Sequence, residues 1–228
     1  MANLPTRVLG GVTVLDTPLI TKALSYARTH LSDLAYNHSV RSWLFGVVIA
    51  SKIDSLKDID KEVHAFSAIL HDLGWDFTGE LVSPDKRFEV DGANAARDFL
   101  KREADGKEWD SQRLQLVWDA IALHTTPSIA VHKQPEVVAT NYGISADLSG
   151  PLGSPGGSLR QEEYDAIVLE FPRLGMMKGL KDIACHLCRT KPATTYDNFV
   201  GQYGEKYVEG FSLAGKRSID FIESSPLE

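Results

Sequence analysis

The chain runs Ala68-Ile69-Leu70-His71-Asp72-Leu73-Gly74 at the end of a segment in which hydrophobic residues recur every three to four positions. That spacing predicts a helix over residues 59–73, and Gly74 is a typical residue to follow a helix C-terminus. His71 and Asp72 therefore stand at the helix end, where both side chains can point at one place. Two ionisable groups at the end of an apolar helix are the first sign of a buried polar site.

The same helix carries a third polar residue on the face of His71. His64 precedes His71 by seven positions, about two helical turns, and so lies on the same side. The neighbouring residues Ala65 and Ala68 are small and leave room for an ion or a ligand. His64 is therefore predicted either to border a bound substrate or to pack in the core.

The three-to-four-residue spacing recurs along the chain, and no convincing run of alternating residues indicates strands. We expect an all-α protein of about eight to ten helices that forms a single domain over residues 1–228. Its core should span about residues 30–150, with the helices of residues 160–223 packed on it. The expected helices cover residues 17–30, 33–53, 59–73, 88–103, 110–125, 135–149, 160–171, 174–189 and 197–210, joined by loops at 75–87, 125–135 and 149–158.

Composition narrows the class of protein. The 228 residues include 24 Lys and Arg against 31 Asp and Glu, a net charge of −7, which disfavours binding to nucleic acid or to an anionic membrane. The N-terminus does not resemble a signal peptide, and the longest apolar stretch, residues 43–50, is shorter than the ~18 residues of a membrane span. Cys185 and Cys188 are too few for a disulfide framework, so we expect reduced thiols in a cytoplasmic protein, with a nuclear location as the alternative.

Three further segments place polar side chains on faces that should pack inward. His38 and Arg41 interrupt the apolar stripe of the second expected helix. His124 continues the stripe of the fifth, and Asp147 lies at the edge of the apolar face of the sixth. A buried carboxylate or imidazolium that stands alone costs several kcal/mol. One divalent cation would neutralise the carboxylates and keep the imidazoles neutral, and mixed nitrogen and oxygen ligands favour zinc, iron or manganese.

Each of these residues also has an ordinary structural interpretation. A single histidine on an apolar stripe is more often a hydrogen-bonded core residue, and this applies to His124. Asp147 could form a salt bridge at a helix end, and Arg41 could pair with an acidic neighbour. The prediction of a metal site therefore depends on all of these residues together.

The order of these residues resembles the HD-domain superfamily of metal-dependent hydrolases. The matching elements are His38 within Asn37-His38-Ser39-Val40-Arg41, the His71-Asp72 pair, and Asp147 within Ser145-Ala146-Asp147. The resemblance covers about residues 30–150. It implies an all-α HD domain in which one metal ion is held by His38, His71, Asp72 and Asp147.

Within the superfamily, the chain looks most like the fungal-type cyanamide hydratase group, because of residues 37–41, its short length and the segment at residues 91–97. That group adds water across a small nitrile-like carbon and usually uses zinc. Superfamily members with two metals carry extra histidines after the HD pair, whereas residues 88–92 contain none here. The resemblance thus implies one divalent transition metal per chain, with zinc first and iron or manganese as alternatives.

The mechanism expected from such a site is attack of an activated water on a small-molecule substrate. A bound divalent cation lowers the pKa of water from about 15.7 toward about 7. His124 is the first candidate for a catalytic acid or base, and Arg41 is expected to act beside the metal ligands or to anchor an anion. Trp75 and Phe77, which follow the HD pair, are expected to wall the substrate pocket, with His64 beside them.

Two rival functions stay open at this point. An HD-type phosphohydrolase of a small phosphate ester or nucleotide needs several cations for the phosphoryl oxygens, and near the motifs the sequence offers Arg41 and then Lys86-Arg87. A non-catalytic protein could retain the metal for stability alone. An apolar stripe in the last helices could support a homodimer or pack on the core; it is formed by Phe199, Tyr203 and Tyr207.

Overall fold

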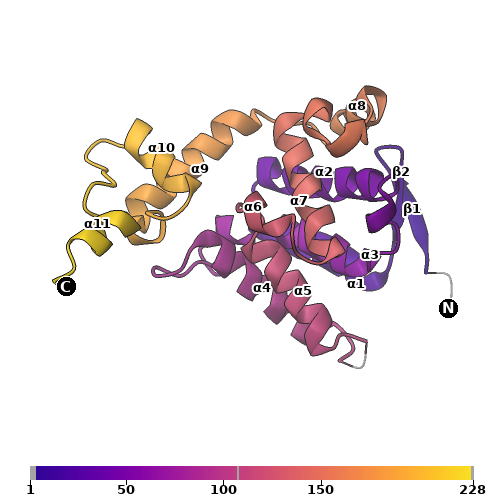
Figure 1. Cartoon of the computed structure of the whole chain (residues 1–228). Coiled ribbons are helices and arrows are strands. Elements are labelled where there is room, and N and C mark those ends of the chain that lie inside the picture. The colour runs from indigo at the N-terminus through magenta and orange to yellow at the C-terminus, as the bar shows by residue number, and fades with distance from the viewer. Residues whose placement is uncertain (1–3, 107, 227–228) are drawn as a thin grey trace. The chain divides into compact units, whose positions relative to one another are not determined.

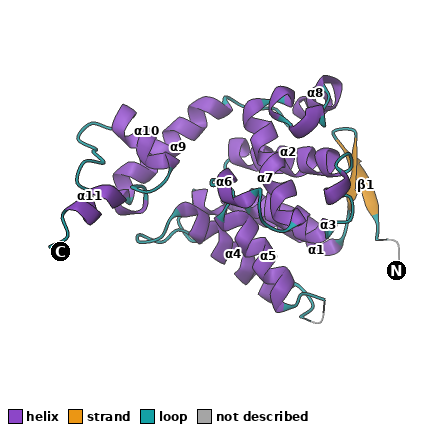
Figure 2. Ribbon diagram, in the orientation of Figure 1, coloured by secondary structure: helices purple, strands orange, loops and turns teal. Residues whose placement is uncertain are grey.

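The computed structural model describes residues 4–106 and 108–226 (Figure 1). Helices dominate it, which confirms the all-α fold class (Figure 2). In chain order the elements are β1 (Thr6–Leu9), β2 (Val12–Leu15), α1 (Pro18–His30), α2 (Asp33–Ala50), α3 (Lys61–Leu70), α4 (Phe88–Glu103), α5 (Ser111–Ala122), α6 (Pro127–Ala130), α7 (Pro135–Ser149), α8 (Gln161–Glu170), α9 (Met176–Thr190), α10 (Phe199–Tyr207) and α11 (Ser218–Glu223). None of these helices is long and apolar enough to cross a membrane.

Two short helices were not expected from the sequence. α6 has four residues and lies in a segment predicted to be a loop, where Pro127 sets the first turn. α11 has six residues and follows the last predicted helix. Neither is long enough for a hydrophobic period to be visible, so the sequence pattern could not indicate them.

The prediction that the chain contains no strands is wrong at the N-terminus. β1 and β2 pair in an antiparallel hairpin, with Thr6 opposite Leu15. Gly10 and Gly11 connect them with positive φ angles of 51° and 76°, which suits a two-residue hairpin turn. Each strand has only four residues, too few for an alternation of apolar and polar side chains to stand out. The Gly10-Gly11 pair is the feature of the sequence that indicates a hairpin here.

The start of α1 follows the capping residues that the sequence offers. The Thr17 hydroxyl accepts a hydrogen bond from the Ile20 N–H at 3.3 Å, and Pro18 occupies the first helical position, where its missing N–H has no partner to lose. α3 begins in the same way, because the Asp60 carboxylate accepts from the Val63 N–H at 3.1 Å. These caps confirm the predicted start of α1 and fix where α3 begins.

The end of α3 determines where the HD pair lies. The helix ends at Leu70 and not at residue 73 as expected. His71 still has helical backbone angles, whereas Asp72 leaves the helix with φ −98° and ψ 16°. A 3₁₀ turn at Leu73–Trp75 follows. The change of direction at Asp72 turns its carboxylate toward the imidazole of His71, which a continued helix would not do.

α2 is the most enclosed helix of the fold and packs closely against α7. Its residues 38–46 are all buried. The two helices cross at Gly46 and Gly143, and a Cβ on Gly143 would collide with the backbone of α2. Because the two helices run antiparallel, the turn after Gly143 lies against the first half of α2. This crossing brings Asp147 to His38.

By its internal contacts the chain divides into two compact units. The first consists of Met1–Val82 and Phe88–Leu174 and contains the hairpin, α1–α8 and the main hydrophobic core. The second consists of Ser83–Arg87 and Gly175–Glu228 and contains α9–α11. The single domain over residues 1–228 stays a prediction.

The second unit has a small interior of its own. Cys185 and Cys188 lie on the buried side of α9 as free thiols, as the sequence predicted. On α10 the ring of Tyr203 lies 6.2 Å from that of Phe199 and 6.0 Å from that of Tyr207, between centroids. The homodimer suggested by this stripe stays a prediction.

Candidate metal centre

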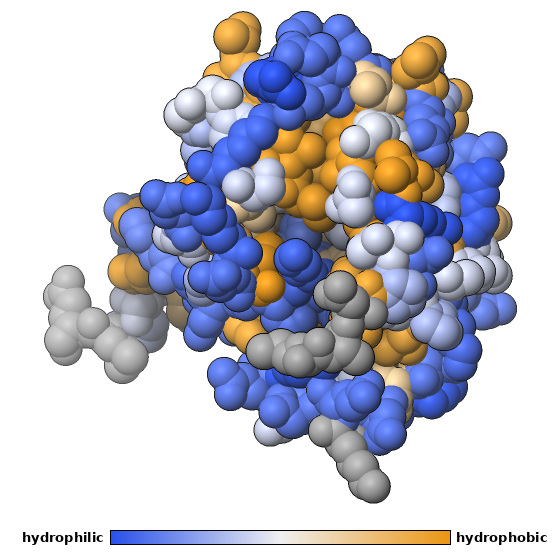
Figure 3. Space-filling model, turned by 90° about the vertical axis from the view of Figure 1, so that its right-hand side faces the viewer, coloured by the Kyte–Doolittle hydropathy of each residue, from blue (hydrophilic) through white to orange (hydrophobic). Residues whose placement is uncertain are grey.

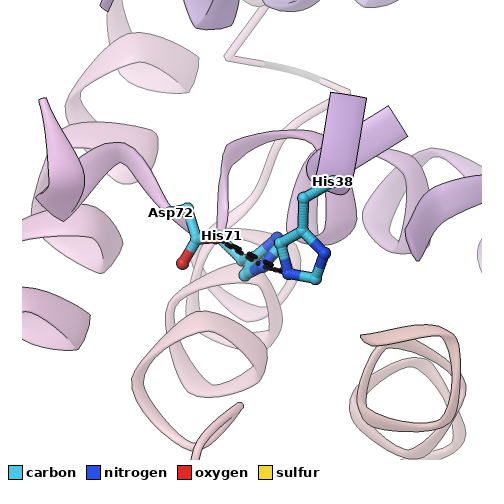
Figure 4. Close-up of side chains that lie close together, drawn as sticks. All are labelled: His38, His71 and Asp72. Atoms are coloured by element: carbon cyan, nitrogen blue, oxygen red, sulfur yellow. Dashed lines mark hydrogen bonds and ion pairs between the residues drawn. The ribbon is translucent and has the colours of Figure 1, made fainter. Parts of the chain in front are cut away.

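His38, His71 and Asp72 come together in the interior of the first unit (Figure 4). His38 lies in the second turn of α2, whereas His71 and Asp72 directly follow the last residue of α3. All three residues are at most 2% exposed. One ligand atom of each lies within 4.8 Å of the others, and the Nε2 atoms of the two histidines are 3.2 Å apart.

Hydrogen bonds on the far side of each ring fix which nitrogen faces this group. His38 Nδ1 donates to Asp147 Oδ2 at 2.6 Å, and His71 Nδ1 donates to the Ala68 carbonyl at 2.8 Å. A neutral imidazole carries a single proton, so each Nε2 is left with a lone pair. Two such lone pairs at 3.2 Å repel each other unless a proton or a cation lies between them. Metal-binding histidines are oriented by bonds of this kind.

Asp72 supplies the negative charge of the group. Its Oδ2 lies 3.1 Å from His71 Nε2 and 3.7 Å from His38 Nε2, yet neither of its buried oxygens accepts a well-aligned hydrogen bond. Burial raises the pKa of Asp72, but the interactions with His71, His38 and His124 together outweigh burial and bring this pKa below its ordinary value. An ionised carboxylate that accepts no well-aligned hydrogen bond, beside the Nε2 atoms of two imidazoles, fits a divalent cation.

Asp147 is not brought into this group. Its Oδ2 accepts the proton of His38 Nδ1, on the side of the ring away from His71, and its Oδ1 accepts from Arg41 Nε at 2.6 Å. Burial raises the pKa of Asp147, but hydrogen bonds from Arg41 and His38 outweigh burial and hold this pKa well below its ordinary value. In this structure Asp147 is thus placed where it orients His38, and its role as a metal ligand, which the resemblance implied, stays a prediction.

Arg41 lies behind Asp147 and is fully buried. Its Nε and Nη2 donate to the Asp147 carboxylate, and its Nη1 donates to the carbonyls of Phe171 and Pro172 at 3.0 Å and 3.1 Å. These bonds use every nitrogen of the guanidinium. Arg41 is thus placed to hold Asp147 and not to anchor a substrate anion.

Arg173 was not singled out from the sequence, although it contacts the same carboxylate. Its Nη1 donates to the Asp147 main-chain carbonyl at 2.6 Å and lies 3.3 Å from Oδ1. The same nitrogen also donates to the Tyr164 hydroxyl at 2.8 Å. Arg173 lies in the turn after α8, where no helical periodicity marks a residue as inward-facing, so no sequence signal could have found it.

His124 borders the group beside Asp72. Its Nδ1 donates to the Ile121 carbonyl at 2.6 Å, so Nε2 carries a lone pair, and this atom lies 3.7 Å from Asp72 Oδ1. The ring centroids of His124 and His71 are 4.9 Å apart. Burial and, to a smaller extent, the neighbouring His71 lower the pKa of His124 to about 4. A neutral imidazole with a free lone pair is the form that can take up a proton during a reaction.

Trp75, Phe77 and His64 were expected to border a substrate. Of these three, the structure places Trp75 beside the group of His38, His71 and Asp72. The Trp75 ring stacks near His38, with 6.4 Å between centroids and planes inclined by 19°. Phe77 is 66% exposed, and its side chain does not pack on the site. His64 is buried, but its Nδ1 lies 3.2 Å from Thr140 Oγ1. Its position on the face of His71 was predicted, but seven residues of helix separate the two by roughly 10 Å along the axis.

The fold and this group of residues define a helical protein equipped to hold a metal. The model of the HD domain family matches residues 35–163, more than half of the chain, and the chain belongs to this family. The match confirms the prediction of a metal-dependent hydrolase in its general form, and the cluster of His38, His71 and Asp72 provides the metal site that such an activity requires. A comparison with curated proteins finds no match to the chain.

Proposed function

We propose that this protein adds water to a small, uncharged nitrile-like substrate of the cyanamide type and releases an amide or urea product. The observation that carries the proposal is that the Nε2 atoms of His38 and His71 lie 3.2 Å apart, adjacent to a buried Asp72 carboxylate that accepts no well-aligned hydrogen bond. We assign these three residues as ligands of one divalent transition ion, with zinc as first choice and iron or manganese as alternatives. When bound, the ion supplies a water of lowered pKa.

An uncharged substrate is favoured by how the nearby arginines are used. Transfer or hydrolysis of a phosphoryl group relies on cations that contact the phosphoryl oxygens. Arg41 and Arg173, the two arginines that reach the histidine side of the group, both donate to Asp147. Their charge is therefore committed to a carboxylate of the protein. A small neutral molecule makes no such demand on the site.

Residues of the chain orient a metal ligand, transfer a proton and limit the size of the substrate. Asp147, held by Arg41, keeps the proton of His38 on Nδ1, so that Nε2 stays available as a ligand atom. Addition of water to the nitrile forms one C–O bond and breaks one C–N π bond, and the O–H proton of the resulting imidic acid then moves to the same nitrogen as the C=O of the amide forms and the second C–N π bond breaks. In the addition itself, one proton passes from water to the nitrile nitrogen. His124 Nε2, which is unprotonated at neutral pH, is the atom that accepts this proton and returns it to nitrogen. Trp75 covers one side of the site and limits the size of the substrate.

The proposal is tested with protein loaded in turn with zinc, iron(II) and manganese. Formation of urea from cyanamide is measured beside phosphate release from p-nitrophenyl phosphate and from nucleotides. We expect urea formation by the loaded protein, loss of activity on chelation, and its recovery when metal is returned. Phosphate release that exceeds urea formation would instead support a phosphohydrolase.

Two variants separate catalysis from folding. His71→Ala should bind less than one tenth of the metal bound by the original protein and lose activity, because it removes a proposed ligand. His132→Ala is the matched control, because His132 is exposed in the turn after α6. This variant should bind the same amount of metal and form urea at the same rate as the original protein. Stoichiometric metal binding without turnover of any of these substrates would point to a metal with a purely structural role.

A further inference from the structure

A cavity of about 320 Å³ lies under the N-terminal hairpin, between β2, α2 and the start of α3. None of the proposed metal ligands, His38, His71 and Asp72, lines it. Its volume falls in the range of small-molecule sites in proteins. Figure 3 looks onto the side of the molecule that carries the hairpin and shows apolar residues gathered around a hollow in that face.

The inner part of this cavity is apolar. Its walls come from β2, α2, the 3₁₀ turn Asp54–Leu56 and the loop that follows this turn. The side chains that form them are Val14, Trp43, Val47, Leu56 and Ile59. Val14, Trp43 and Leu56 are at most 3% exposed, so they form the closed end. His64 also borders this end, and burial lowers its pKa to about 4, so it is uncharged at neutral pH. The interior therefore suits a hydrocarbon group.

The open end of the cavity carries positive charge. The described residues that line it include Lys57 and Lys61 and no carboxylate. Lys57 forms an ion pair with Asp54, with 2.5 Å between Nζ and Oδ1. Lys61 is exposed at the first position of α3, and among the described residues no carboxylate lies within 4 Å of its ammonium group. One uncommitted cation at the rim of an apolar chamber is complementary to a molecule with one anionic head.

We propose that this cavity is a binding site for a small amphipathic monocarboxylate, with its hydrocarbon chain against Trp43 and Val47 and its carboxylate at Lys61. The site is separate from the metal centre and does not depend on the proposed hydratase activity. Each methylene buried in the chamber should tighten binding about fourfold. The ion pair at the exposed rim should contribute about two- to fivefold.

The test uses the full chain and sodium octanoate as the probe, with hexanoate and octanol as comparators. Binding is measured by titration calorimetry and by the change in tryptophan fluorescence. We expect one saturable site per chain, about fifteenfold weaker binding of hexanoate, which lacks two methylenes, and weaker binding of octanol. Because the chain has four tryptophans, Trp43→Phe identifies the reporter: the fluorescence change should disappear in this variant while the heat of binding persists.

Four further variants decide whether the ligand occupies this cavity. Val47→Phe fills the chamber and should weaken octanoate binding more than tenfold. Ser51→Trp blocks the rim from an exposed position and should do the same, so that the test stands even if Val47→Phe disturbs the fold. Lys61→Gln should weaken octanoate about two- to fivefold without affecting octanol, and Lys61→Arg should restore the affinity.

The outcomes that would overturn the proposal are equally specific. Octanoate that does not bind, or that binds Ser51→Trp as tightly as the original protein, excludes the cavity as the site. Octanol that binds as tightly as octanoate, with Lys61→Gln unchanged, excludes recognition of a carboxylate. Neither result bears on urea formation, so failure here is distinguishable from failure of the proposed hydratase function.

Discussion

Arg41 and Asp147 form a doubly hydrogen-bonded ion pair inside the first unit, with 2.6 Å between Nε and Oδ1 and 2.8 Å between Nη2 and Oδ2. Both side chains have no solvent exposure. Oδ2 also accepts a hydrogen bond from His38 Nδ1 at 2.6 Å. A guanidinium from the same helix as His38 thus sets the position of the carboxylate that orients this histidine, and the charge of the carboxylate is balanced before any metal is present.

Removing the guanidinium should leave Asp147 buried with much of its charge uncompensated. We expect Arg41→Met to lower the free energy of unfolding by about 3–5 kcal/mol, the usual cost of breaking a buried ion pair on one side. Urea denaturation followed by circular dichroism measures this value. Arg160→Met is the control, because Arg160 makes its ion pair with Glu163 at the surface and its loss should change stability little. Equal stability of the original protein and Arg41→Met would show that the pair does not stabilise the fold.

Replacing the carboxylate by an amide tests whether Asp147 orients His38 or binds the metal itself. Asp147→Asn keeps the shape of the side chain but weakens the hold on the His38 Nδ1 proton. If Asp147 acts through His38, metal affinity should fall about 10–100-fold with one ion still bound at saturation. The affinity is measured by competition with a chelator. Loss of stoichiometric binding, as expected for His71→Ala, would instead make Asp147 a direct ligand.

The helices and the HD pair could be predicted because their signals are local. A repeat of apolar residues every three to four positions marks an amphipathic helix. Thr17-Pro18 marks the start of α1 independently of residues elsewhere in the chain. The need to balance buried charge predicted a common site for the inward-facing polar residues, and the resemblance to the HD-domain superfamily implied that His38, His71 and Asp72 belong to it together with Asp147. The structure brings the first three together.

The place of Asp147 could not be predicted in the same way. Helical phase puts its side chain on an inward face, but it does not tell whether the carboxylate meets Nε2 or Nδ1 of His38. That choice depends on how closely α2 and α7 cross at Gly46 and Gly143, which is a tertiary property. The same limit applies to His64. Helical phase indicates that His64 shares a face of α3 with His71, but it does not show that Thr140, on α7, is the partner of its imidazole.

The buried imidazole of His64 should make the fold sensitive to acid. Burial lowers the pKa of His64 from 6.5 to about 4, and the Trp43 carbonyl offsets only part of this effect. Between these two pH values the unfolded chain binds a proton that the folded protein does not, so stability is lost as the pH falls from about 6.5 to about 4. The full contribution is on the order of 3 kcal/mol. Stability is measured by urea denaturation of the metal-free protein across this range.

His64→Gln isolates this contribution from that of other acid-sensitive groups. The difference in unfolding free energy between the original protein and the variant should change by the stated amount between pH 7 and pH 4. His132→Gln, at an exposed position, should show no such pH-dependent difference. A difference between the original protein and His64→Gln that stays constant with pH would mean that His64 is protonated in the folded protein as readily as in the unfolded chain.

The close crossing of α2 and α7 should control both stability and metal binding. A Cβ on Gly143 would collide with the Ser42 carbonyl and the Gly46 backbone, and neither can move without separating the two helices. Gly143→Ala should therefore cost about 1–3 kcal/mol of stability and draw Asp147, one turn later on α7, away from His38. Metal affinity should fall in the same variant, although no metal ligand is changed. Gly106→Ala is the matched control, because a Cβ there meets no atom within 4 Å. If Gly143→Ala were destabilised but bound metal with the original affinity, the position of Asp147 would not depend on this crossing.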